Sequence, residues 1–295
     1  SRDEFKQSEM QKEFCNKKYN YLRYFIGDIR DRERLNEAFI GVDIIFHAAA
    51  LKQVPALEYN PSEAIKTNIY GAENVIKAAL YNNVKKVIAI STDKAVSPVN
   101  LYGATKLCFE KLFIAANNIV GDRDTKFCVL RYGNVFKSRG SVVPLFLEQS
   151  KNNKFTVTEK NMTRFNLTLE NAINFVLICS YKMIGGEIFI PKLKSYNIIQ
   201  LCKVINPNAE IEITGVRPGE KIHECMINMV ETDSCVECDN YFIVMSNTLL
   251  DFNVIYNKYL SNYKSDNIKK LEPKEEYISG GDMLTNEELY ILLNK

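Results

Sequence analysis

Short apolar segments alternate with helical patterns along the first two thirds of the chain, and this alternation limits the possible folds most strongly. Four segments have the length and composition of strands, at residues 21–28, 42–49, 85–91 and 126–135. Two stretches with apolar residues three or four positions apart, 61–81 and 99–118, predict amphipathic helices. Strands separated by helices in this way form parallel βαβ units with right-handed crossovers. The sequence therefore predicts an α/β protein with a Rossmann-like, doubly wound parallel sheet.

The rest of the chain has a looser pattern. After Gly140 it predicts a helix at 169–181, strands at 186–191 and 210–214, and a short helix after Arg217-Pro218-Gly219-Glu220-Lys221. We expect residues 1–190 to form an NADP-binding Rossmann-like domain, with parts of 137–167 contributing to a substrate lobe. Residues 191–295 would form the smaller C-terminal substrate-binding lobe and a tail, whose helix signals after Asn247 are mixed.

Composition argues against several classes of protein. The formal net charge is +2 and no stripe of Lys and Arg stands out, so we expect no nucleic-acid partner. We find no apolar run that could span a bilayer and no signal peptide, so we expect a cytoplasmic protein with no membrane partner. The eight cysteines fit reduced thiols. The C-x-x-C at 235–238 lacks further ligands, because His47 and His223 are the only histidines, and we expect no metal.

The segment from Ser91 to Lys106, STDKAVSPVNLYGATK, contains the groups needed to oxidise an alcohol. Tyr102 and Lys106 are four residues apart and therefore share one helix face. An ammonium at Lys106 would stabilise a phenolate at Tyr102, lowering its pKa from about 10 toward neutral pH. A phenolate can take the proton of a hydroxyl group while a nicotinamide accepts the hydride. The same spacing occurs in solvated pairs, but the Ser91-Thr92 strand end favours catalysis, since its hydroxyl could bond the same substrate oxygen.

Asp93 and Lys94 follow the same strand end and add an acid and a base. A ketone at one sugar carbon acidifies the proton on the neighbouring carbon. A neutral Lys94 could remove that proton and a protonated Asp93 could donate to the departing hydroxyl, which together eliminate water. The alternative interpretation is a surface turn in which Asp93 caps the next segment.

Longer motifs make the chain resemble the extended short-chain dehydrogenase/reductase family. Within this family it is most similar to the inverting UDP-N-acetylglucosamine 4,6-dehydratases of the pseudaminic acid pathway. The resemblance runs from Ser1 to about Ile243, over SRDEFKQSEM, GDIRDRERL, HAAALKQVPALEYNP, IKTNIYGAENVI, STDKAVSPVNLYGATKL, LRYGNVFKSRGSVVP, MTRFNLTL and RPGEKIHE. It implies a lyase that removes water from UDP-N-acetylglucosamine with inversion at C5, giving a UDP-4-keto-6-deoxy-hexosamine for surface glycans or flagellin sugars.

The resemblance also implies roles for the reacting residues. Thr92 would orient the substrate hydroxyl, Asp93 would release water from C6, and Lys94 would be the base at C5. Tyr102 would be the base at the C4 hydroxyl, and Lys106 would hold Tyr102 and the nicotinamide ribose. The nucleotide-sugar would be held by Lys52, Asn134, Arg139, Arg217 and Glu220, with arginine suited to its diphosphate.

NADP is the cofactor that the resemblance implies, because an arginine after the family's second strand can pair with the adenosine 2′-phosphate. The residues expected at the cofactor are Ser1, Arg2, Lys6, Asp28, Ile29, Ala48, Ala49, Thr67, Tyr102 and Lys106. The family's glycine-rich phosphate loop does not precede Ser1. We therefore expect a parallel sheet lacking its first strands and weak binding of NADP.

Two other functions remain open at this stage. A UDP-sugar 4-epimerase would need Tyr102 and Lys106 but no acid and base such as Asp93 and Lys94. A truncated, non-catalytic homologue would be a binding or scaffold protein. Members of the family form dimers or hexamers, so the resemblance implies a homo-oligomer.

Overall fold

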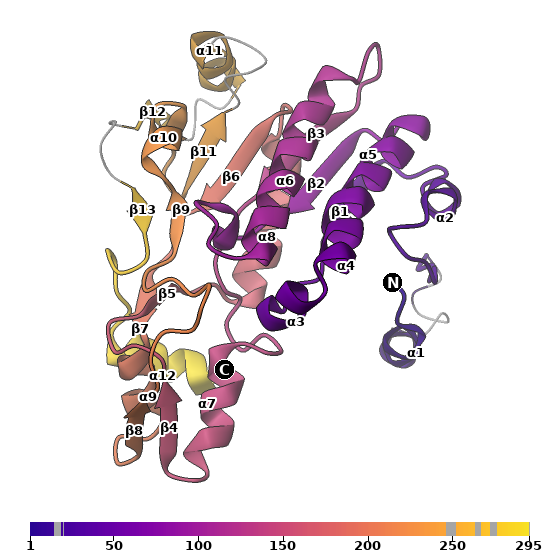
Figure 1. Cartoon of the computed structure of the whole chain (residues 1–295). Helices are drawn as coiled ribbons and strands as arrows, with labels where there is room; N and C mark the ends of the chain where they lie inside the picture. The colour runs from indigo at the N-terminus through magenta and orange to yellow at the C-terminus, as the bar shows by residue number, and fades with distance from the viewer. Residues whose placement is uncertain (15–18, 20, 246–251, 263–266, 272–275, 295) are drawn as a thin grey trace.

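The computed structural model describes residues 1–14, 19, 21–245, 252–262, 267–271 and 276–294. Its centre is a seven-stranded sheet (Figure 1). In spatial order the strands are β1 (Ile44–His47), β2 (Lys86–Ile90), β3 (Lys126–Leu130), β6 (Glu187–Pro191), β11 (Tyr241–Met245), β10 (Cys235–Glu237) and β12 (Lys269–Lys270). The first four strands pair in parallel and the last three are antiparallel to their neighbours. The predicted α/β class with a parallel sheet is confirmed.

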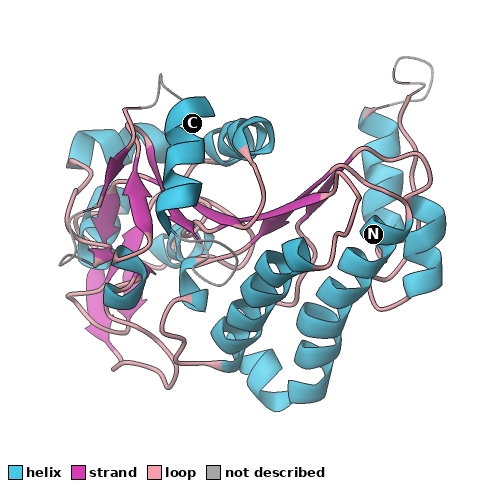
Figure 2. Ribbon diagram, turned by 90° about the horizontal axis from the view of Figure 1, so that it is seen from above, coloured by secondary structure: helices cyan, strands magenta, loops and turns pink. Residues whose placement is uncertain are grey.

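Apolar residues on both sides of each central strand bury the two faces of the sheet under helices (Figure 2). The covering helices are α5 (Gly71–Tyr81), α6 (Leu101–Ala115) and α8 (Leu169–Lys182). Val87 of β2 belongs to the same apolar cluster as Phe113 of α6, whereas the next residue, Ile88, clusters with Phe175 of α8. Successive side chains of a strand point to opposite faces, so α6 and α8 lie on opposite sides of the sheet.

Two helices begin and end as their local sequences dictate. The helix predicted at 61–81 is α4 (Pro61–Ile65), a π-helical turn η1 (Lys66–Tyr70) and α5 in succession, with proline at the favourable first position. The helix predicted at 99–118 starts later, at Leu101, because the side chain of Asn100 caps it by accepting a hydrogen bond from the Gly103 N–H at 2.8 Å. It ends in the short η3 (Ala116–Asn118).

A second group of elements lies below the sheet in Figure 1. It consists of α7 (Val142–Ser150), β4 (Lys154–Val157), α9 (Ile198–Ile205), β8 (Glu210–Ile213) and α12 (Asn286–Asn294). Its core includes Phe146, Phe155, Leu201 and Leu289, all buried. Two strand pairs lie between this lobe and the sheet: β5 (Thr163–Phe165) with β7 (Ser195–Asn197), and β9 (Cys225–Ile227) with β13 (Tyr277–Ile278).

The remaining elements are short or peripheral. They are α1 (Glu4–Glu13), α2 (Arg32–Ala38), α3 (Val54–Tyr59), η2 (Asp93–Ala95), α10 (Met229–Thr232) and α11 (Phe252–Asn262). The start of the tail, residues 246–251, lies outside the described residues. Among the described helices, none has the length and apolar character needed to cross a membrane.

Two sequence predictions about local structure are wrong. Residues 21–28 form no strand in their described part, and Tyr21, Phe25 and Ile26 are exposed. A strand needs a partner, and no described strand pairs with this segment. The edge of the sheet is instead β1, where Ile44 is 44% exposed and Phe46 is 46% exposed. No helix follows Arg217 to Lys221 either, because that segment makes tight turns, with Gly219 at φ +79°.

The division of the chain at residue 190 remains a prediction. After this point the chain returns to the sheet, because β11 and β10 extend it beyond β6. The lower lobe also takes α7 and β4 from residues 142–157. The sheet and the lobe are therefore each built from segments on both sides of residue 190.

Candidate active site

A tight turn connects β2 to α6 and carries the predicted acid and base. The side-chain oxygen of Thr92 accepts a hydrogen bond from the Lys94 N–H at 3.4 Å, which fixes the short helix η2. Asn100 holds the far side of the turn, since its amide nitrogen donates to the Gly219 carbonyl at 2.8 Å. Lys221 also donates to the Val96 carbonyl. The turn is thus held on one side by its own hydrogen bonds and on the other by the 217–221 loop.

Gly103 allows the first turn of α6 to lie directly against this turn. A Cβ at residue 103 would overlap the Lys94 carbonyl oxygen and approach Pro98 Cβ to 3.0 Å. We expect Gly103→Ala to displace the Asp93-Lys94 backbone, costing about 1–3 kcal/mol in stability and about 100-fold in turnover. Thermal unfolding and turnover measure the two effects. Gly281→Ala is the control, because a Cβ there meets nothing within 4 Å; equal behaviour of the two variants would contradict this packing.

Five polar side chains meet at the turn. The Lys94 ammonium lies 3.1 Å from Asp93 Oδ1, 3.2 Å from Asn134 Oδ1 and 3.2 Å from Glu224 Oε1. The Thr92 hydroxyl donates to the same Asp93 oxygen at 2.9 Å. Asp93 is fully buried, and its Oδ2 has no hydrogen-bond partner among the described residues. Asp93 is therefore part of a buried ionic cluster, and the alternative of a simple surface turn is excluded.

Lys94 is charged in this cluster, whereas the sequence led us to expect a neutral lysine. Burial raises the pKa of Asp93, and the nearby Glu224 raises it further, against the effect of Lys94, so that its net shift is upward. Burial works against the Lys94 ammonium, but Asp93 and Glu224 outweigh it and hold the pKa of Lys94 above its usual range. The acid is thus suited to hold a proton, as expected. The lysine, by contrast, is ionised here and must lose a proton before it can act as a base.

Tyr102 faces the same groups. Burial raises its pKa, while the charge of Lys94 and a hydrogen bond with Thr92 lower it in part. Its hydroxyl is therefore coupled to Thr92, Asp93 and Lys94, as the sequence predicted.

Lys106 has a different environment from the expected one. Its ammonium donates to the Ile90 carbonyl at 2.7 Å and lies 3.2 Å from the centre of the Phe109 ring. Burial lowers the pKa of Lys106 to about 7, against the opposing effect of Glu110. Lys94 and Thr92 partly lower the pKa of Tyr102, and Lys106 does not contribute to this lowering. The predicted stabilisation of a phenolate by Lys106 is thus not seen in this arrangement.

Two adjoining cavities lie at the carboxyl ends of the parallel strands. One, of about 480 Å³, is lined by Thr92, Lys94, Tyr102 and Lys106 together with the predicted substrate residues Lys52, Asn134 and Glu220. The other, of about 960 Å³, is lined by Ser1, Arg2, Lys6, Asp28, Ile29, Ala48, Ala49 and Thr67 among others. Ala48 and Ala50 line both. We name them the reaction cavity and the cofactor cleft.

The predicted cofactor residues fit their proposed ligand in shape and chemistry. The cofactor cleft has cations at Arg2 and Lys6 on one side and the small side chains of Ala48 and Ala49 on the other. The Thr67 hydroxyl is buried and has no partner among the described residues, so it is available to a ligand. The carboxyl ends of parallel strands are where nucleotides bind in such sheets. The residues that are present therefore fit the adenosine end of a dinucleotide.

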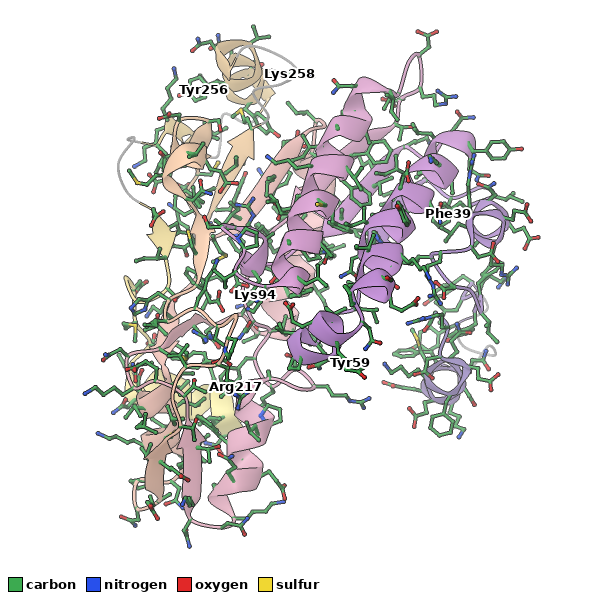
Figure 3. All side chains as sticks on the ribbon, in the orientation of Figure 1. Phe39, Tyr59, Lys94, Arg217, Tyr256 and Lys258 are labelled. Atoms are coloured by element: carbon green, nitrogen blue, oxygen red, sulfur yellow. The ribbon has the colours of Figure 1, made fainter. Side chains whose placement is uncertain are left out.

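The predicted substrate residues are only partly brought together. Arg217 and Glu220 line a third cavity with Lys94, and Figure 3 shows Lys94 above Arg217 at the junction of sheet and lobe. Lys52 lies in the reaction cavity and donates to the Arg139 carbonyl at 3.4 Å. The Arg139 side chain is exposed and lines none of these three cavities.

Two charged residues of the site were not predicted. Glu224 contacts Lys94, and Arg164 lies 3.7 Å from the same Glu224 oxygen. Both stand in motifs that carried the resemblance, MTRFNLTL and RPGEKIHE. No local pattern joins them to Lys94, which is 70 residues from Arg164 and 130 from Glu224 along the chain.

The fold and the site together define a class of protein. A parallel sheet with helices on both faces, and a Tyr-x-x-x-Lys pair beside a Thr-Asp-Lys turn at its carboxyl rim, are the features of an extended short-chain dehydrogenase/reductase. The profile of the family described as "Polysaccharide biosynthesis protein" matches residues 1–246. The chain belongs to this family.

Individual relatives agree with this assignment. A Campylobacter jejuni protein named UDP-N-acetylglucosamine 4,6-dehydratase (inverting) is 53% identical over 246 residues, which are 83% of this chain and 73% of that protein. A Rickettsia bellii protein named UDP-glucose 4-epimerase is 42% identical over 290 residues, covering 93% and 83%. The solved structure of Pen from Bacillus thuringiensis superposes with a TM-score of 0.87 at 38% identity, covering 99% of this chain and 87% of that one.

Proposed function

We propose that this protein is a hydro-lyase that converts UDP-N-acetylglucosamine into a UDP-4-keto-6-deoxy-hexosamine, with inversion at C5. The observation that carries the proposal is the placement of Lys94, Thr92 and Tyr102 at one cavity, with the buried Asp93 carboxyl 3.1 Å from the Lys94 ammonium. An acid and an amine at that position are needed to eliminate water and are superfluous for oxidation alone. The 53% identity to the inverting dehydratase of Campylobacter jejuni supports the same reaction.

The first step uses Thr92 and Tyr102. Thr92 orients the C4 hydroxyl and Tyr102 takes its proton, in a site where burial strengthens each hydrogen bond. A bound nicotinamide supplies the redox chemistry, since it accepts the hydride from C4 and returns it to C6. Lys106 and Thr67 would hold the cofactor, with Ser1, Arg2, Lys6, Asp28, Ile29, Ala48 and Ala49 around its adenosine end.

The second step uses Asp93 and Lys94. The C4 ketone acidifies the C5 proton, which Lys94 takes once its own surplus proton has left. Asp93 gives its proton to the C6 hydroxyl, and water departs. Lys52, Asn134, Arg217 and Glu220 would hold the nucleotide-sugar from three sides, and Arg139 would have to turn inward to reach the diphosphate.

NADP is the cofactor that we propose, because Arg2 stands at the mouth of the cofactor cleft. The Arg2 guanidinium lies 3.5 Å from Asp28 and is half exposed, so it is free to meet a 2′-phosphate. We expect Arg2→Ala to weaken binding of NADP about 10- to 100-fold, the loss of one charge-assisted hydrogen bond, and to leave NAD binding nearly unchanged. Titration calorimetry with the two cofactors measures this. Equal losses for NADP and NAD would contradict the assignment.

A UDP-sugar 4-epimerase is the second candidate, and the 42% identity to the Rickettsia bellii protein of that name favours it. Incubation with NADP and UDP-N-acetylglucosamine in D₂O separates the two reactions. A dehydratase releases water and introduces deuterium at C5, which NMR detects. An epimerase returns a hexose with its C6 hydroxyl and without deuterium at C5, and that product would overturn the proposal. Assembly as a homo-oligomer remains part of the proposal.

A further inference from the structure

We propose that Glu224 is the counter-ion and proton acceptor of Lys94, a positioning residue that leaves Asp93 free to hold the proton lost with the C6 hydroxyl. The inference rests on the proposed function, which assigns the acid role to Asp93 and the base role to Lys94. Glu224 is not among the residues predicted from the sequence.

Lys94 lies between two buried carboxylates. Its ammonium is 3.1 Å from Asp93 Oδ1 and 3.2 Å from Glu224 Oε1. Asp93 is 0% exposed and Glu224 is 3% exposed. Two buried carboxylates that share one ammonium compete for it, so the carboxylate with fewer other cationic contacts is the one that more readily holds a proton.

Contacts around the cluster decide which carboxylate is ionised. Glu224 has a second cation, the Arg164 side chain of β5 at 3.7 Å. Burial raises the pKa of Glu224, but Lys94, Arg164 and the nearby Lys221 outweigh burial and lower it. Asp93 faces Lys94, Tyr102 and the charge of Glu224, and its pKa is raised. Glu224 is therefore the carboxylate and Asp93 the carboxylic acid.

Each of the two carboxyl groups has one oxygen without a hydrogen-bond partner among the described residues. Asp93 uses Oδ1 to accept from Lys94 and Thr92, and Oδ2 has no partner among the described residues. Oδ2 is thus the oxygen that can carry the proton. Glu224 Oε2 is likewise without a partner there, and Glu224 lines a cavity with Lys94 and Arg217.

The backbone of Glu224 is fixed independently of these charges. Its N–H donates to the Ser279 hydroxyl at 2.8 Å, and its carbonyl accepts from the Ser279 N–H at 2.7 Å. The neighbouring His223 is occupied with the Thr163 hydroxyl at 2.8 Å. Replacing the Glu224 carboxylate therefore leaves the strand pairing in place.

The proton balance of the elimination follows from this arrangement. At the start Asp93 is protonated, Lys94 is an ammonium and Glu224 is a carboxylate. Lys94 gives one proton to Glu224 as it takes the C5 proton, so that no neutral lysine accumulates, while Asp93 gives its proton to the leaving C6 hydroxyl. At the end Glu224 is protonated, Asp93 is ionised and Lys94 is again an ammonium. The charges of Asp93, Lys94 and Glu224 sum to zero at both stages, so the elimination leaves the charge of this buried site unchanged.

The experiment replaces Glu224 by Gln, which keeps the shape and removes the charge. Asp93 then becomes the counter-ion of Lys94 and holds its proton only at lower pH. The infrared band of protonated Asp93 is isolated by subtracting the spectrum of Asp93→Asn in each background. As the pH is raised, this band should disappear at a lower pH in Glu224→Gln than in the wild type. The subtraction also removes Glu187, another buried carboxyl whose burial raises its pKa. An Asp93 band with an unchanged pH dependence would overturn the proposal.

Turnover gives the second readout. Elimination should fall about 100-fold or more in Glu224→Gln, while reduction of NADP by the substrate persists, and Glu224→Asp should restore part of the elimination. The exposed Glu212→Gln, whose side chain pairs with Lys154 at 3.1 Å, is the control that should behave as wild type. If the wild-type protein catalyses no elimination, that result counts against the proposed function. The infrared titration would still decide the role of Glu224.

Discussion

Lys94→Ala should reduce elimination of water far more than oxidation at C4, which slows only through the lost effect of Lys94 on the pKa of Tyr102. Lys94 is the amine closest to Asp93, at 3.1 Å, and shares the reaction cavity with Tyr102. Removing it deletes the base at C5 while Thr92 and Tyr102 still hold the C4 hydroxyl. We expect elimination to fall by about 100- to 10,000-fold, the usual contribution of one general base. Single-turnover absorbance of reduced nicotinamide and NMR of the sugar measure the two steps separately.

A matched control separates this effect from the loss of a partly buried lysine as such. Lys192 is similarly shielded, pairs with Glu237 at 2.7 Å and does not line the reaction cavity. Lys192→Ala should retain full elimination. If Lys94→Ala still formed the 4-keto-6-deoxy product at the rate of the control, Lys94 would have no role as the base.

Arg131→Met should produce a large loss of stability, because Arg131 is paired with two acidic residues, Glu110 and Glu231. Arg131 is 1% exposed and forms a double ion pair with Glu110, at 2.7 and 3.1 Å, and another with Glu231, at 2.8 and 2.9 Å. It also donates to the Met226 carbonyl at 2.7 Å. Methionine fills the space of Arg131 but leaves the carboxylates of Glu110 and Glu231 without their cation, which lowers the free energy of unfolding by about 3–5 kcal/mol. We expect the unfolding temperature to fall by about 10 °C.

The companion substitutions test the cause of that loss. Glu110→Gln in the Arg131→Met background removes one of the stranded charges and should recover part of the stability. Arg123→Met, on the exposed turn before β3, should change the unfolding temperature little. A loss in Arg131→Met no larger than in Arg123→Met would show that the cluster contributes no stability.

This buried cluster also supports the active site. The Ser91 hydroxyl donates to Glu110 at 2.6 Å, and Ser91 directly precedes Thr92. Glu110 stands one turn of α6 after Lys106, whose pKa it raises against the effect of burial. The segment at 226–231 is therefore tied to the strand end and the helix that carry the reacting groups.

The strands of the sheet could be predicted because each is marked in the local sequence by a short run of apolar residues. β1, β2 and β3 are apolar runs that lie side by side in the sheet in the order in which they occur in the chain. Residues 21–28 have the same local signal and form no strand, since the described sheet offers them no partner. Strand formation depends on pairing, which one segment alone does not encode.

The same distinction applies to the active site: features set by local sequence could be predicted, and features set by contacts distant in the sequence could not. Thr92, Asp93, Lys94 and Tyr102 lie within one turn and one helix start, so their convergence follows from local sequence. The charge of Lys94 could not be predicted in this way, because it depends on Glu224, which folding brings from the other side of the molecule. Lys106 was assigned to Tyr102 by spacing, but spacing carries no information on the Ile90 carbonyl that accepts its hydrogen bond.

The path of the hydrogen at C4 tests the central claim most directly. UDP-N-acetylglucosamine with deuterium at C4 is incubated with the protein and NADP, and the product is examined by NMR and mass spectrometry. If Thr92, Asp93, Lys94 and Tyr102 act on three consecutive carbons, the deuterium moves within one molecule from C4 to C6 of a 6-deoxy-4-keto sugar. Deuterium that returns to C4 of a hexose with its C6 hydroxyl intact would contradict the account.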